Sequence, residues 1–122
     1  KKEMDMSDSV DIYHNPRCSK SRATLELLES RGIEVSVIEY LKEPPDDIEL
    51  RQLLDLLGIS ARELLRTSEA PYKELNLADP SKTEDEIIEA ILKFPILMER
   101  PIVTTNSKAR LGRPPEAVLE IL

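Results

Sequence analysis

The chain has 122 residues with 17 basic and 24 acidic side chains, a formal net charge of −7, which argues against binding nucleic acid or an anionic membrane through bulk charge. Apolar residues make up 40% and aromatic residues 3% of the chain. That is enough for one core of Leu, Ile and Val, whereas two domains would be cramped. Because no stretch approaches the roughly 20 apolar residues of a membrane span, and the chain starts without a signal-peptide segment, we expect a soluble, cytoplasmic protein.

The first third of the chain predicts a β-α-β unit. Residues 10–13 favour a short strand, and residues 19–31 have a helical composition that stops at Gly32. Residues 34–40 alternate and are rich in β-branched side chains, so they predict a second strand. A right-handed crossover through the helix would make the two strands parallel neighbours.

The middle of the chain predicts three helices. The first begins at residues 44–47, where two prolines precede two aspartates, and it runs through Leu57 to a stop at Gly58. The second is short and ends near Arg66, and the third ends before Pro95. Both later helices begin with the spacing of a capping box, formed by Ser60 with Glu63 and by Thr83 with Glu86.

The end of the chain predicts β-β-α. Residues 101–105 and 108–111 favour a hairpin, and residues 114–122 a closing helix. The complete order predicts an α/β, thioredoxin-like fold, in which a four-stranded mixed sheet has a helical insertion between its β-α-β and β-β-α halves. Ligands of such sheets bind beyond the carboxyl ends of the strands, where the first helix begins. Cys18 occupies that place.

The chain has one cysteine, Cys18, and one histidine, His14. One cysteine excludes an intramolecular disulfide and a Cys-rich zinc site, and Ser21 stands where a C-x-x-C pair would need its second thiol. Since only these two side chains are soft ligands, we expect no metal site. If Cys18 takes part in redox chemistry, its resolving thiol must come from another molecule.

The run HNPRCSKSR surrounds Cys18 with groups that favour a thiolate. The helix N-terminus offers free N–H groups, which would also hold an incoming oxyanion. His14 adds a donor or a charged neighbour. A lone cysteine is most often an unreactive buried side chain, but a polar, cationic turn is a poor place to bury one, so we favour a reactive thiol. The nearby cations and hydroxyls are Arg17, Lys20, Arg22, Ser19 and Ser21.

The same run resembles the active-site motif of the glutaredoxin-dependent arsenate reductase family, a group with the thioredoxin fold. The resemblance continues through ARELLRTSEAPYKELNLAD, LMERPIV and ARLGRPPEAVLEIL, so it covers the chain from Val10 to Leu122. We therefore interpret residues 10–122 as a single thioredoxin-like arsenate reductase domain. Residues 1–9 are interpreted as an N-terminal extension, part of which we treat as non-native.

The resemblance implies roles for individual residues. The nucleophile of the family maps to Cys18, and a histidine that helps to lower the pKa of the thiol maps to His14. We add Ser21 to the substrate-binding group as a hydroxyl donor. Three family arginines bind the arsenic oxyanion, which suits the permanent charge and forked donors of this side chain. The matching residues here are Arg66, Arg100 and Arg113.

Three other arginines and one proline carry predictions of their own. By residue type alone an arginine is usually a solvated surface residue, and Arg17, Arg22 and Arg110 keep that interpretation. A proline that opens a strand beside a thioredoxin-like active site is commonly cis, and the resemblance puts Pro101 in that place.

The implied reaction is the reduction of arsenate to arsenite. The Cys18 thiolate attacks arsenic, and glutathione, a co-substrate rather than a bound cofactor, reduces the adduct and leaves a mixed disulfide that glutaredoxin resolves. A single cysteine excludes the other type of arsenate reductase, which passes a disulfide among several cysteines of its own.

Two alternatives stay open. Regulators of the same superfamily bind RNA polymerase; their oxidant-sensing members need a C-x-x-C, which this chain lacks, but a non-redox interaction module remains open. An enzyme that acts on a different thiol adduct, such as a glutathione conjugate, also fits a lone reactive cysteine.

Overall fold

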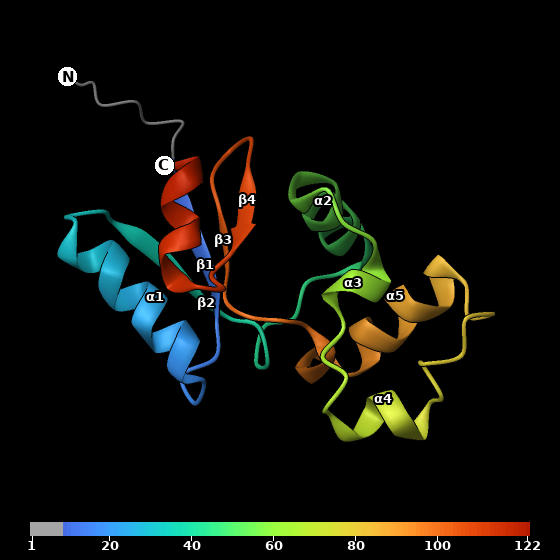
Figure 1. Ribbon diagram of the computed structural model, residues 1–122. Helices are drawn as coiled ribbons and strands as arrows, with labels where there is room; N and C mark the ends of the chain where they lie inside the picture. Colours follow the sequence, from blue (N-terminus) through green and yellow to red (C-terminus); the bar gives the residue numbers. More distant parts are fainter. Residues whose placement is uncertain (1–8) are drawn as a thin grey trace. The chain divides into compact units, whose positions relative to one another are not determined.

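The structure is a computed structural model that describes residues 9–122. Most of the predicted N-terminal extension, residues 1–8, lies outside the described residues. The described chain forms two compact units (Figure 1). Of the described residues, 9–39 and 100–122 form the sheet unit, and 40–99 form the helical unit. The interpretation of residues 10–122 as a single domain stays a prediction.

A four-stranded mixed sheet, in the order β2-β1-β3-β4, forms the frame of the sheet unit. β1 pairs in parallel with β2 because α1 carries the chain across between them, whereas β3 is antiparallel to both β1 and β4. This confirms the predicted mixed sheet and its interruption by a helical insertion. The elements are β1 (Val10–His14), α1 (Ser19–Ser30), β2 (Val35–Glu39), β3 (Ile102–Thr104) and β4 (Ala109–Leu111).

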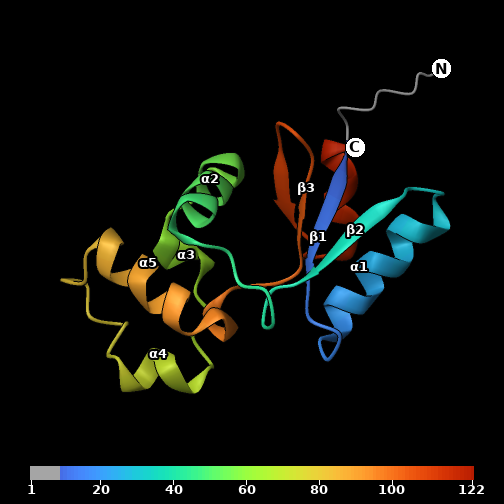
Figure 2. The same ribbon diagram turned by 180° about the vertical axis from the view of Figure 1, so that it is seen from behind.

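The core of the sheet unit lies between one face of the sheet and two helical segments. α1 and the C-terminal segment η2 (Pro115–Ile121) both cover this face (Figures 1 and 2). Alternate residues of β1 are buried, and since side chains two apart share a face, His14 points to the same side as Ile12. The buried cluster contains Val10, Ile12, Leu28, Val103 and Val118.

The closing helix differs from the α-helix predicted for residues 114–122. η2 is a 3₁₀-helix, in which Ala117 donates its N–H to the carbonyl of Pro114 at 2.9 Å. Two consecutive prolines begin this segment without N–H donors, which suits a short segment held by tighter i→i+3 hydrogen bonds.

The helical unit contains α2 (Asp47–Leu57), α3 (Ala61–Leu64), α4 (Ala70–Glu74), α5 (Glu84–Lys93) and the 3₁₀-helix η1 (Pro95–Leu97). Both predicted capping boxes are present, and Gly58 ends α2 with a left-handed φ of 70°. α4 was not predicted; it fully buries none of its residues, so its sequence carries no apolar stripe that could indicate a helix.

The second predicted helix ends earlier than expected. α3 stops at Leu64, and Leu65 is extended and pairs with Met98 in an isolated bridge. The N–H of Arg66 then donates to the carbonyl of Leu97 at 2.7 Å. This pairing across the helical unit replaces the last helical turn, so Arg66 lies on an extended segment. Within residues 9–122, no helix combines the length and apolar character needed to cross a bilayer.

Candidate functional site

Cys18 is the N-cap residue of α1, just beyond the carboxyl end of β1. A tight turn leads into it, because the N–H of Cys18 donates to the carbonyl of Asn15 at 2.9 Å with Pro16 at the second turn position. The side-chain oxygen of Asn15 accepts from the N–H of Arg17 at 3.0 Å, and its backbone N–H donates to Ser21 Oγ at 3.1 Å. Asn15 thus fixes the loop that presents the thiol through three hydrogen bonds, a role that sequence reasoning missed.

The surroundings of Cys18 favour its thiolate. Burial alone would raise the pKa of Cys18, but hydrogen bonds from the backbone N–H of Ser21, the side chain of Arg100 and the backbone N–H of Lys20 outweigh burial and lower the pKa from its ordinary value. Two of these donors belong to the first turn of α1, as expected for an anion at a helix N-terminus. The third comes from the opposite end of the chain.

Arg100 and Arg113 reach Cys18 from the segments that flank the β3–β4 hairpin. The pairing of the two strands continues beyond the sheet, since the N–H of Gly112 donates to the carbonyl of Pro101 at 2.9 Å. Arg113 Nε donates to the carbonyl of Arg100 at 2.9 Å, and Arg113 Nη2 lies 3.9 Å from Cys18 Sγ. The structure therefore brings both predicted arginines to the thiol. The peptide bond before Pro101 is cis, as expected.

His14 and Ser21 form a buried pair behind the loop. His14 Nδ1 lies 2.6 Å from Ser21 Oγ. Burial lowers the pKa of His14, Glu39 opposes this shift and Arg22 adds to it, with a net lowering. The imidazole is therefore neutral near pH 7. Ser21 Oγ also accepts from the backbone N–H of Asn15. Its hydroxyl donates to Nδ1 in the neutral tautomer that carries the ring proton on Nε2.

This arrangement gives His14 and Ser21 a structural contact that differs from the roles predicted for them. A neutral His14 supplies no positive charge to the thiol, and the hydroxyl of the fully buried Ser21 is engaged with His14. The first turn of α1 and the end of β1 are tied together by this hydrogen bond. The predicted catalytic role of His14 and the predicted substrate contact of the Ser21 hydroxyl stay predictions.

Arg66 belongs to the helical unit and is held by two carboxylates. Its Nε lies 3.1 Å from Glu69 Oε2 and its Nη1 lies 2.9 Å from Glu99 Oε1, with 20% of the Arg66 side chain exposed. An oxyanion that binds this guanidinium would compete with both glutamates. The predicted part of Arg66 in the site of Cys18 stays a prediction.

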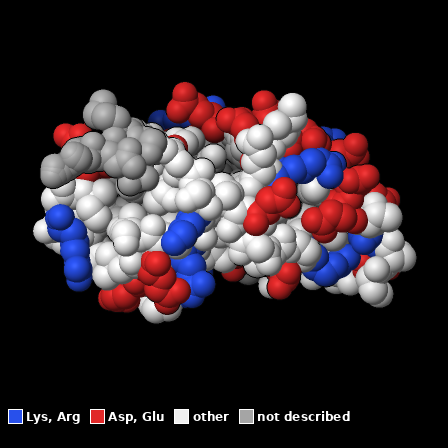
Figure 3. Space-filling model, turned by 90° about the horizontal axis from the view of Figure 1, so that it is seen from above, with Lys and Arg blue, Asp and Glu red and all other residues white. Residues whose placement is uncertain are grey.

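Arg17, Arg22 and Arg110 are exposed, as predicted for surface arginines. Arg22 donates to the carbonyl of Pro16 at 2.8 Å, and Arg110 pairs with Glu120 at 3.2 Å. Acidic side chains outnumber basic ones in the helical unit, over which they gather in Figure 3, whereas the sheet unit is nearly balanced. The positive character of the thiol site is therefore local, and it comes from the arginines beside Cys18.

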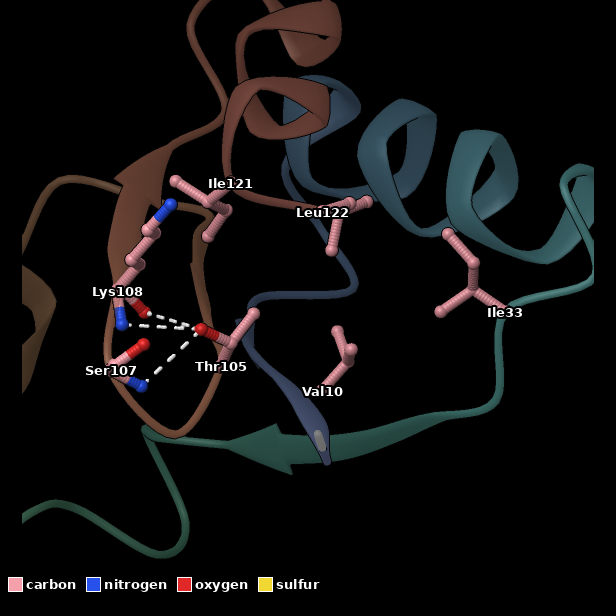
Figure 4. Close-up of a pocket in the computed structure, with 7 residues that line it drawn as sticks. All are labelled: Val10, Ile33, Thr105, Ser107, Lys108, Ile121 and Leu122. Atoms are coloured by element: carbon pink, nitrogen blue, oxygen red, sulfur yellow. Dashed lines mark hydrogen bonds between the residues drawn. The ribbon is translucent and has the colours of Figure 1, made fainter. Parts of the chain in front are cut away.

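A pocket of about 370 Å³ lies elsewhere in the sheet unit (Figure 4). Its lining includes Val10, where β1 begins, whereas Cys18 follows the end of that strand. Its walls are mostly aliphatic, and the Thr105 hydroxyl is engaged with the backbone of Ser107 and Lys108. This pocket is separate from the thiol site.

Residues 13–121 match the ArsC family. The chain belongs to the ArsC family. YfgD of Escherichia coli K12, named an uncharacterized protein, is 59% identical over 118 residues, which cover 96% of this chain and 99% of YfgD. An arsenate reductase of Escherichia coli is 49% identical over 93% of this chain and 81% of its own length.

Solved structures of ArsC relatives agree with the thioredoxin-like fold of the chain. The arsenate reductase from Vibrio cholerae is 52% identical and superposes with a TM-score of 0.91, covering 95% of this chain and 99% of that one.

The contact between Arg100 and Cys18 predicts a measurable change in thiol reactivity. Because the thiolate is the reactive form, a lowered pKa keeps Cys18 reactive at lower pH. Replacing Arg100 by Ala removes a donor and a cation, so the pKa of Cys18 should rise and alkylation by iodoacetamide below that pKa should slow. The rate of alkylation as a function of pH measures the shift.

Arg110→Ala serves as the matched control, because Arg110 is exposed and pairs with Glu120. Its rate profile should match that of the parent protein. A parent profile with its midpoint near the ordinary thiol value of about 8.5 would contradict the assignment.

Proposed function

We propose that the protein reduces arsenate to arsenite, with Cys18 as its nucleophile and with glutathione and glutaredoxin as the source of electrons. The observation that carries the proposal is a thiol of lowered pKa at a helix N-terminus, with two guanidinium groups beside it. The identity of about half to proteins named arsenate reductase supports the same substrate.

The first step is binding and attack. A tetrahedral oxyanion at Cys18 would receive hydrogen bonds from N–H groups in the first turn of α1 and from the forked donors of Arg100 and Arg113. The thiolate then forms a sulfur–arsenic bond, and one arsenate oxygen leaves as water after it has taken up protons. The arginines neutralise the negative charge that would otherwise repel the thiolate.

The second step transfers the electrons. Glutathione forms a second sulfur–arsenic bond and displaces another oxygen as water. When the two sulfurs join, both sulfur–arsenic bonds break and arsenic keeps one electron pair, so it leaves as trivalent arsenite. The product is a mixed disulfide between Cys18 and glutathione. A thiol of glutaredoxin attacks the glutathione sulfur and releases the Cys18 thiolate.

The cysteine content supports an external reductant. A chain with one cysteine cannot close a disulfide of its own, so the oxidising equivalents must leave on another molecule. Reduced glutathione and glutaredoxin act in a reducing compartment, and we therefore propose that the protein works in the cytoplasm.

Replacing Cys18 by Ser tests the nucleophile. Serine is a far weaker nucleophile at neutral pH, so arsenate-dependent oxidation of NADPH, coupled through glutathione, glutaredoxin and glutathione reductase, should fall to the background rate. The variant should still fold, because Cys18 is only partly buried. Turnover equal to that of the parent protein would exclude the mechanism, and an interaction module would show no turnover in either protein.

Replacing Arg113 by Ala tests the oxyanion site. A charge-assisted hydrogen bond contributes about 2 kcal/mol, so kcat/KM for arsenate should fall by about 30-fold. Arg113→Lys should recover part of this loss, because lysine restores the charge without the planar fork. Arg110→Ala should leave kcat/KM unchanged. Equal losses for Arg110→Ala and Arg113→Ala would remove the support for a specific oxyanion site.

The ion pairs of Arg66 offer a separate test of its predicted role. If Arg66 binds arsenate, Glu99 competes with the substrate, and the isosteric Glu99→Gln change should lower KM by up to about fivefold, the range of a partly exposed ion pair. Glu74→Gln is the control, since Glu74 is exposed in the same unit. If KM is unchanged in both variants and Arg66→Ala only lowers the thermal unfolding midpoint, Arg66 is structural.

A further inference from the structure

The contact of Arg113 with Cys18 depends on a close approach between α1 and the end of β4. A Cβ atom added at Gly112 would lie 2.6 Å from Thr24 Oγ1 and 2.7 Å from Pro101 Cγ. Both distances are well below van der Waals contact. φ of Gly112 lies outside the left-handed region, so space rather than backbone conformation requires the glycine here.

The atoms that would meet this Cβ have little freedom to move away. Thr24 is β-branched and fully buried, and its hydroxyl donates to the carbonyl of Lys20 at 2.8 Å. The other atom belongs to the ring of Pro101, which is also buried. A side chain at position 112 would therefore push the end of β4 away from α1 rather than displace its neighbours.

The same short segment carries Arg113. Gly112 donates its N–H to the carbonyl of Pro101, and Arg113 Nε donates to the carbonyl of Arg100, each at 2.9 Å. The guanidinium of Arg113 then reaches to 3.9 Å from Cys18 Sγ. Since Cys18 begins the helix that contains Thr24, the separation of Gly112 from that helix sets how closely Arg113 approaches the thiol.

We propose that Gly112 is a positioning residue: its missing side chain lets the end of β4 lie against Thr24 of α1 and so holds the Arg113 guanidinium beside the Cys18 thiolate. The positioned charge serves the oxyanion in the proposed function. The approach of the Arg113 charge to the Cys18 sulfur can be measured without arsenate.

Alkylation by two reagents of different charge measures this approach. Iodoacetate is an anion and iodoacetamide is neutral, so the ratio of their rate constants with Cys18 reports nearby positive charge and cancels the fraction of thiolate. Arg113→Ala should lower the ratio by about fivefold, since a unit charge about 4 Å from the reacting atom has this effect even at the dielectric constant of water. Gly112→Ala should lower it by a similar factor.

A double-variant cycle separates positioning from general damage. If Gly112 acts through Arg113, adding Gly112→Ala to Arg113→Ala should lower the ratio no further. Removing the crowded side chain with Thr24→Ala in the Gly112→Ala background should restore part of the ratio. A parent-like ratio in Gly112→Ala, multiplied effects in the double variant, or no recovery with Thr24→Ala would overturn the proposal.

Gly32→Ala is the control for stability. Gly32 has φ of 74° and open space around its Cα, so alanine there should lower the thermal unfolding midpoint by strain while leaving the reagent ratio unchanged. A Gly112→Ala protein without a cooperative unfolding transition would assign Gly112 to the core and also overturn the proposal. If the predicted ratios appear but the parent protein does not reduce arsenate, the proposed function fails and the positioning role stands.

Discussion

The need to stabilise a thiolate at the partly buried Cys18 is the constraint on which the site depends. Removing an anion from water is unfavourable unless hydrogen-bond donors replace the lost solvation. At Cys18 the donors come from two distant parts of the sequence, the first turn of α1 and Arg100. They meet because β1, which leads to Cys18, is the neighbour of β3, which follows Arg100. The strand order of the sheet therefore brings these donors to the thiol, in addition to forming the core.

Two guanidinium groups beside one sulfur repel each other, and the structure offsets this repulsion through the backbone. Arg113 donates to the carbonyl of Arg100, so one arginine is anchored to the peptide group of the other. The buried His14 is kept neutral, which avoids a third positive charge in the same space. Stabilisation of the thiolate therefore rests on arginine and backbone N–H groups, while the imidazole ties β1 to α1 through Ser21.

The sequence predicted those features that depend on local patterns. Alternation, capping pairs and the glycine stops placed the strands, most helices and the position of Cys18 at a helix N-terminus. Features that depend on distant contacts escaped prediction: the early end of α3 follows from the pairing of Leu65 with Met98, and the need for glycine at position 112 follows from Thr24. Motif resemblance found Arg100 and Arg113, but it could not indicate that Arg66 is paired with two glutamates.

In the proposed reaction, anion binding and the chemistry at sulfur would select for different properties of the substrate. Guanidinium forks and helix N–H groups recognise the charge and tetrahedral shape of an oxyanion, and phosphate shares both with arsenate. These groups alone would therefore hold either anion. Thiols reduce pentavalent arsenic to the trivalent level but do not reduce the phosphorus of phosphate, so phosphate would occupy the site and leave unchanged. In that reaction, selectivity for arsenate would rest on the reduction at Cys18, and the arginines would contribute affinity and orientation rather than the choice of element.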